Sequence, residues 1–153
     1  MPSSRQRQSK APEVAESFAH ISERMLIGAQ IIFYSGTEEP FAMTHLCGHS
    51  VEAGLKAILA KSGVSQDELR KKFGHNLERL WCEVAEQTGL LPKTPPTWLV
   101  NLNDLHGVPY KLRYPIGLKG LDFPNQKIMY VQTIELNKIM SPYVWSRKSN
   151  SAD

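Results

Sequence analysis

Apolar residues recur at three- and four-residue steps in the long segments of this chain, and this spacing constrains the fold more than any other feature. Such steps place side chains on one face of an α-helix. In the first segment, which begins near Glu13, the positions are Val14, Phe18, Ile21, Met25, Ala29 and Ile32. Alternating β-branched runs bounded by hairpin turns, the signature of strands, do not occur in the sequence. The chain is therefore predicted to be all-α.

Glycine and proline divide the rest of the chain into further helices and one long loop. The predicted helices span about residues 13–34, 41–61, 76–88, 96–106 and 125–142. Pro142 is expected to end or kink the last one, because proline lacks a backbone N–H and its ring clashes with the preceding turn. Residues 107–125 are rich in glycine and proline and predict a loop.

The 153 residues provide enough chain for one domain. Residues 1–12 are polar and predict a disordered basic tail, residues 13–145 a helical bundle, and residues 146–153 a second disordered tail. The two tails carry +3 and +1, so the net charge of +3 leaves the body at −1. The near-neutral body does not suggest a surface for double-stranded nucleic acid, where a clustered basic face is expected.

The sequence favours a cytoplasmic protein. It has no apolar run long enough to cross a bilayer, and no apolar stretch follows the charged N-terminus as in a secretory signal. Cys47 and Cys82 alone do not make a disulfide framework or a zinc knuckle. Glycine-rich phosphate loops are also missing from the sequence. We therefore expect no membrane association and no cofactor.

The segment 41–61 carries two unusual stripes. Small residues that allow another helix to approach closely lie on one face: Cys47, Ser50, Gly54 and Ala57. A polar stripe follows steps of four, three and four residues: His45, His49, Glu52 and Lys56. Polar groups are therefore predicted to line one edge of a helix whose other faces are expected to be buried.

Two interpretations of the polar stripe remain open. His45, His49 and Glu52 have the residue types and helical spacing of three zinc ligands, although Lys56 in the same stripe would repel a cation. The alternative, which we favour, is a polar seam that hydrogen-bonds to neighbouring helices. In that case Glu52 and Lys56 form an ion pair. His75 itself is expected to cap its helix or to orient the preceding loop.

Three motifs, taken in order, resemble those of the HEPN family. They are Glu52-Ala53-Gly54-Leu55-Lys56-Ala57, Gly74-His75-Asn76-Leu77 and Leu112-Arg113-Tyr114-Pro115. The resemblance covers roughly residues 13–142. It implies an antiparallel bundle of four to five helices that is often a homodimer. Members are described as nucleotide-binding, as partners of nucleotidyltransferase-type proteins in toxin–antitoxin pairs, or as metal-independent endoribonucleases.

The ribonucleases of this family use an arginine followed four to six residues later by a histidine, usually in the last part of the bundle. The formal match here is Arg70 and His75, which lie before the third predicted helix instead. Our first hypothesis is therefore a non-catalytic binding module for a nucleotide, an RNA or a partner protein. Its ligand residues would be Arg113, whose planar fork suits phosphate, and Tyr114, which can stack on a base, together with Glu52, Lys56 and His75. The alternatives are an endoribonuclease that uses Arg70 and His75, and a structural dimerisation domain that uses the small-residue stripe.

Overall fold

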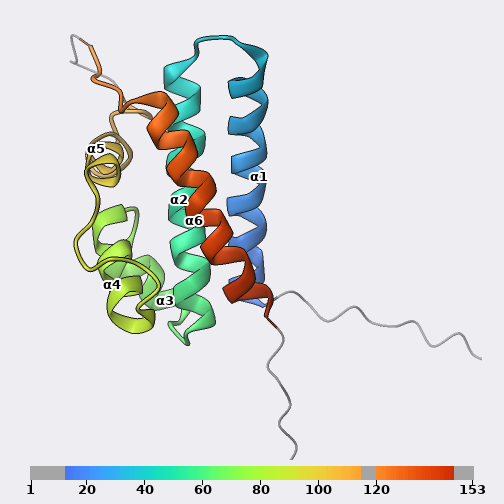
Figure 1. Ribbon diagram of the computed structural model, residues 1–153. Helices are drawn as coiled ribbons and strands as arrows, with labels where there is room; N and C mark the ends of the chain where they lie inside the picture. Colours follow the sequence, from blue (N-terminus) through green and yellow to red (C-terminus); the bar gives the residue numbers. More distant parts are fainter. Residues whose placement is uncertain (1–12, 115–119, 147–153) are drawn as a thin grey trace, which may run out of the picture.

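A computed structural model describes residues 13–114 and 120–146, so both predicted tails fall almost wholly outside it (Figure 1). The described residues form helices and no strands, which confirms the all-α prediction. The elements are α1 (Val14–Ser35), α2 (Pro40–Lys61), α3 (Gln66–Glu68), the π-helical turn η1 (Leu69–Phe73), α4 (Leu77–Thr88), α5 (Thr97–His106) and α6 (Gln126–Trp145).

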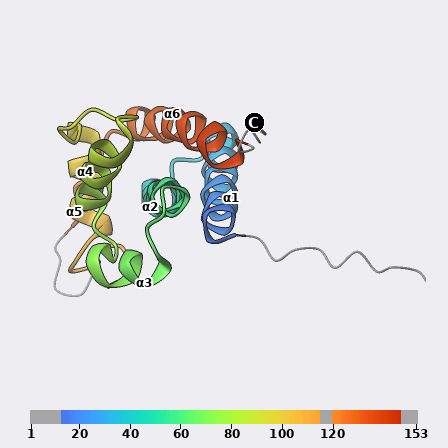
Figure 2. The same ribbon diagram turned by 90° about the horizontal axis from the view of Figure 1, so that it is seen from below.

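Helix α2 is the centre of the structure. Helix α1 packs on one side of it, α4 and α5 lie on the opposite side, and α6 crosses a third side between them, as the view along its axis shows (Figure 2). Its residues from Val51 to Leu59 are buried without interruption. Polar residues in this stretch are therefore enclosed, and buried polar groups need hydrogen-bond partners inside the fold.

The small-residue stripe of α2 serves a contact within the chain. Ser22 on α1 and Ser50 on α2 each donate a hydroxyl hydrogen bond to the other's backbone carbonyl, at 2.7 and 2.8 Å. Gly54 faces the same serine, because a Cβ at this position would lie 3.0 Å from Ser22 Oγ. The expectation that this stripe lies at a subunit contact is therefore wrong: it joins α2 to α1 inside one chain.

Pro142 was expected to end or kink the last helix; it does not end it, because α6 continues to Trp145. The last turn is attached to α1 by side chains, because Trp145 Nε1 donates to Glu23 Oε1 at 3.1 Å and Ser141 Oγ donates to the same oxygen at 3.5 Å. These tertiary contacts offset the backbone hydrogen bond that the proline removes.

The segment between α2 and α4 fixes the position of His75. Ser65 caps α3, accepting a hydrogen bond from Glu68 N at 3.2 Å. The charged run that follows forms η1, in which Gly74 N donates to Leu69 O across five residues at 3.2 Å. Asn76, rather than His75, caps α4 by accepting from Arg79 N. His75 is thus left between two caps with its side chain free to turn toward α2.

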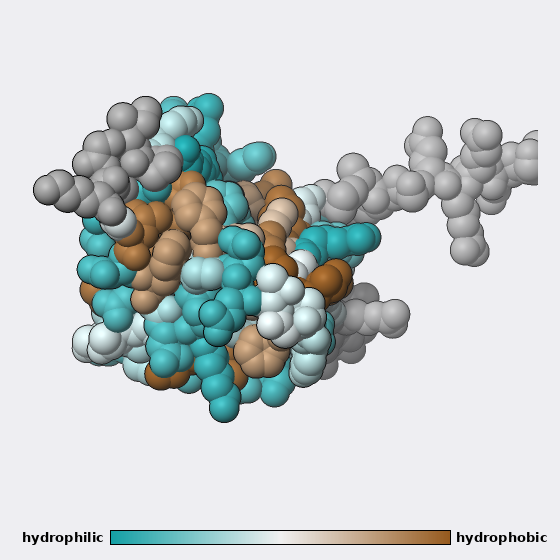
Figure 3. Space-filling view, turned by 90° about the horizontal axis from the view of Figure 1, so that it is seen from above, coloured by the Kyte–Doolittle hydropathy of each residue, from teal (hydrophilic) through white to brown (hydrophobic). Residues whose placement is uncertain are grey.

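The end of the molecule where α1 joins α2 exposes apolar side chains among polar ones (Figure 3). Phe33 and Phe41 are each 38% exposed, and Tyr34 is 74% exposed. No helix of the described residues has the length and apolar character needed to cross a membrane.

Candidate functional site

A buried carboxylate joins three basic side chains from three parts of the fold. Glu52 of α2 is 9% exposed. Its Oε1 accepts hydrogen bonds from Nδ1 of His75 at 2.7 Å and from Nε2 of His106 at 2.9 Å. Its Oε2 accepts from Nζ of Lys56, one helical turn further along α2, at 3.3 Å. We call Glu52, Lys56, His75 and His106 the Glu52 cluster.

The partners of Glu52 keep it ionised. Burial alone raises the pKa of a carboxyl group, but here the hydrogen bond from His106, the charge of Lys56 and the hydrogen bond from His75 outweigh it and lower the pKa of Glu52 to about 2. An ionised carboxylate only accepts hydrogen bonds, so each histidine must donate from the nitrogen that faces it. The proton on His75 is therefore on Nδ1, and its Nε2 has no hydrogen-bond partner among the described residues.

His106 is enclosed where α5 ends. It is 4% exposed, and its ring lies against the backbone of α2 at Gly48. A Cβ at Gly48 would stand 2.5 Å from Nδ1 of His106, closer than real Cβ contacts. The absence of a side chain at position 48 is therefore what lets this imidazole reach Glu52.

A second polar group continues the cluster toward solvent; we call His49, Tyr110 and Arg113 the outer group. The guanidinium of Arg113 lies 5.6 Å from the centre of the Tyr110 ring, and Nη2 of Arg113 is 3.5 Å from Nε2 of His49. The Tyr110 ring centre in turn lies 5.6 Å from that of His75. Arg113 is exposed, so its donors remain accessible to a ligand.

The histidines of α2 are held in the neutral form. Burial, followed by the repulsion that a second proton on His106 or His45 would add, lowers the pKa of His49 to about 4. Burial and the charges of His106 and Arg113 also lower the pKa of His45. Neutral His49 can accept the hydrogen bond from Arg113. Nδ1 of His45 is buried and has no partner in the described part of the chain.

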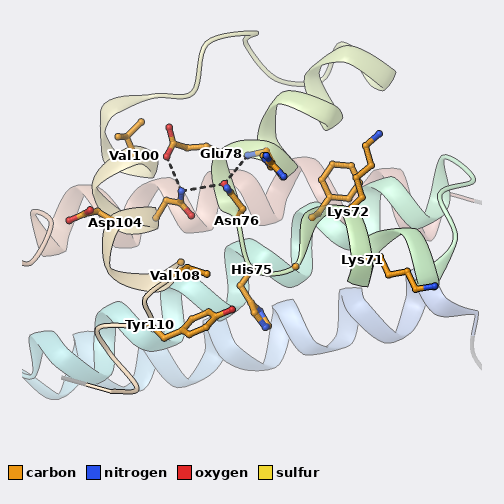
Figure 4. A pocket seen from close by; sticks show the side chains of 14 residues that line it. Lys71, Lys72, His75, Asn76, Glu78, Val100, Asp104, Val108 and Tyr110 are labelled. Atoms are coloured by element: carbon orange, nitrogen blue, oxygen red, sulfur yellow. Dashed lines mark hydrogen bonds between the residues drawn. The ribbon is translucent and has the colours of Figure 1, made fainter. Parts of the chain in front are cut away.

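His75 lies at the junction of two clefts. The first has a volume of about 470 Å³ and extends between α4, α5 and the loop that carries Tyr110. Figure 4 shows His75 and Tyr110 side by side at one edge of it, with Lys71 and Lys72 at another. The second cleft, of about 600 Å³, lies between η1 and α1 and is lined by Arg70, Lys56 and His75. The accessible edge of the imidazole is therefore reached from either side.

The sequence-predicted site residues are only partly brought together. Glu52, Lys56 and His75 meet in the Glu52 cluster, and Arg113 lies beside it in the outer group. Tyr114 is 64% exposed and belongs to neither group as the interactions above define them. Arg70 reaches the second cleft but pairs with Asp67 at 3.0 Å.

The predicted metal ligands are rearranged by the fold. Among the described residues, the histidine, cysteine and carboxylate groups close enough to share an ion are Glu52, His75 and His106, not His45, His49 and Glu52. The rings of His45 and His49 do pack edge to face, with centres 4.6 Å apart. Cys47 is a packed thiol whose pKa burial raises to about 11.

The chain matches no protein-family model, no curated protein and no solved structure. Its candidate site therefore stands on its own geometry.

Two residues of this site, His106 and Tyr110, were missed by sequence reasoning. His106 lies 54 residues from Glu52, where it read only as the end of a helix, and Tyr110 stood in an apparently irregular loop. No signal in the sequence pointed to them: four of the five histidines of the chain gather in this one region, but only the fold brings them together.

Proposed function

We propose that this chain is a HEPN-like binding module that holds a phosphate-bearing ligand of the nucleotide or RNA-end class beside His75. One observation carries the proposal: Tyr110 and the anchored imidazole of His75 line a cleft of about 470 Å³, and the exposed guanidinium of Arg113 lies against the Tyr110 ring beside it. This volume lies in the range of small-molecule sites. The order of the three motifs and the packing of α1 and α2 as an antiparallel pair support the HEPN-like bundle.

Each group has a role in such a site. The planar fork of Arg113 suits a phosphate, and the ring of Tyr110 offers a surface on which a base stacks. His75 offers its Nε2 to a ligand hydroxyl, since Nδ1 is committed to Glu52. Lys72 and Arg79 add positive charge to the lining of the cleft. Of its two acidic residues, Asp104 is paired with Lys111 at 3.3 Å and Glu78 accepts a hydrogen bond from Asn103 at 2.8 Å. The ligand residues of the proposal are thus Arg113, Tyr110 and His75, with Glu52 and Lys56 positioning the imidazole.

The test is thermal unfolding of the chain with AMP, ATP, a 5′-phosphorylated RNA oligonucleotide and, as a phosphate-free probe, adenosine. A ligand present at a hundred times its Kd stabilises the folded state by about 2.7 kcal/mol. We expect stabilisation by the phosphorylated probes and little by adenosine. Arg113→Ala should abolish it, whereas Arg24→Ala, which removes an exposed arginine of α1, should leave it unchanged. Equal binding by Arg113→Ala, or by adenosine, would contradict the proposal.

A second candidate, a metal-independent endoribonuclease, is favoured by the common cleft of Arg70 and His75. In such a reaction Nε2 of His75 would take the proton of a ribose 2′-hydroxyl as its oxygen bonds to the adjacent phosphorus, and Arg70 would neutralise the charge of that phosphate. The bond from phosphorus to the 5′-oxygen would break, and this oxygen would leave with a proton from water. The same RNA incubated with a metal chelator distinguishes the two candidates. Fragments ending in a 2′,3′-cyclic phosphate, lost in Arg70→Ala, support the enzyme, and intact RNA supports the binding module.

A further inference from the structure

We propose that Glu52, His75 and His106 form a site for one divalent transition-metal ion of the Zn²⁺ class. This inference is independent of phosphate binding. Two histidines and a glutamate are a ligand set of catalytic zinc sites, in which three protein ligands leave a fourth position open. The three side chains come from α2, from the loop before α4 and from the end of α5, so the fold, rather than one helical repeat, assembles them.

The ligand atoms already converge. Nδ1 of His75 and Nε2 of His106 point at the same oxygen, Glu52 Oε1, and all three atoms lie within 4.8 Å of one another. Ligands about 2.0–2.2 Å from a tetrahedral ion are separated by about 3.3 Å. To admit an ion, the two pairs with Glu52, at 2.7 and 2.9 Å, would open by about half an ångström, and the two histidine nitrogens, within 4.8 Å of one another, would adopt the same spacing. Each imidazole would then carry its proton on its other nitrogen.

Lys56 determines the strength of this site rather than its existence. Lys56 contacts Oε2 of Glu52, whereas the two imidazoles face Oε1. Its charge opposes a cation a few ångströms away, and its hydrogen bond fixes the orientation of the carboxylate. The site is therefore expected to bind more weakly than a structural zinc site.

The site also has an entrance. His106 is enclosed, but the side chain of His75 is 36% exposed and lines both clefts. A water molecule or a ligand atom can therefore reach the fourth position from solvent, as a catalytic rather than a structural metal requires. Rigid neighbours support the geometry, since Gly48 leaves room for His106 and Asn76 fixes the start of α4 next to His75.

The experiment titrates the chelator-treated full chain with Co²⁺, followed by its visible absorption, and with Zn²⁺ in competition. We expect one ion per chain. His75→Ala, a change at a half-exposed position, should weaken binding at least a hundredfold while circular dichroism reports an intact fold. His75→Cys should restore binding and add the ultraviolet charge-transfer band of a cobalt thiolate. Lys56→Met should tighten binding about tenfold, because it removes the opposing charge.

The matched control is His49→Ala, which removes the histidine of the helical stripe and leaves all three proposed ligands in place. It should bind Co²⁺ like the wild type. Loss of binding in this variant with retention in His75→Ala would move the ion to His45, His49 and Glu52 and overturn the assignment. Absence of one-to-one binding by the wild type at millimolar Co²⁺ would leave the cluster as a hydrogen-bonded core and refute the proposal outright.

Discussion

Replacement of Glu52 by alanine is expected to lower the free energy of unfolding by about 3–5 kcal/mol, the usual cost of removing one partner from a buried ion pair. Lys56 is 7% exposed and would keep its charge in the core without a counter-ion. His75 and His106 would lose their acceptor at the same time. Urea unfolding followed by circular dichroism measures the loss.

Asp67→Ala is the matched control for this change. Asp67 also joins more than one basic side chain, Arg70 at 3.0 Å and Lys71 at 2.9 Å, but its side chain is 60% exposed. Exposed pairs are worth up to about 1 kcal/mol, so this variant should stay close to the wild type. If Glu52→Ala costs no more than Asp67→Ala, the Glu52 cluster is not the buried network described above.

Gly48→Ala is expected to destabilise the protein by about 1–3 kcal/mol, the cost of overpacking a core. Alanine is the better helix former by about 1 kcal/mol, so a loss in the middle of α2 must come from tertiary contact. The new Cβ would meet Nδ1 of His106 at 2.5 Å. That ring cannot move aside without breaking its hydrogen bond to Glu52.

Gly28→Ala, in the middle of α1, provides the comparison. Its Cβ would lie 3.4 Å from Leu46 Cδ1, an ordinary contact with the tip of a flexible side chain. Alanine should therefore stabilise α1 by about 0.5–1 kcal/mol. Opposite signs for the two variants in urea unfolding are the expected result. Stabilisation by both would mean that His106 is not held against α2 as the structure describes.

Sequence periodicity was sufficient for the long helices, because their stability comes from apolar faces that can be read at three- and four-residue steps. Periodicity did not predict the elements whose structure depends on tertiary contacts. The charged run after Glu68 gave no helical signal, yet it forms η1 with Leu69 and Phe73 buried beneath it. Likewise α6 passes Pro142 because Trp145 and Ser141 attach its last turn to Glu23.

The residues of the candidate site likewise include some that the sequence predicted and some that it could not predict. Glu52 and Lys56 were found because a helix places residues four apart on one face, and His75 because its motif resembles that of a known family. His106 was not found, because nothing in a single sequence pairs it with a glutamate 54 residues away. Tyr110 lies beside His75 because of the conformation of its loop. A loop has no sequence periodicity from which such a contact could be predicted.

The histidine tautomers test the central claim, that Glu52 accepts a hydrogen bond from each imidazole and thereby leaves Nε2 of His75 facing outward. They are read from side-chain nitrogen shifts in NMR spectra of the metal-free, ¹⁵N-labelled chain at neutral pH, assigned with His75→Ala and His49→Ala. We predict a proton on Nδ1 of His75 and on Nε2 of His106, each a distinct and slowly exchanging signal. A His75 ring protonated on Nε2 alone would mean that Glu52 does not hold it, and would contradict both the site and the function proposed for it.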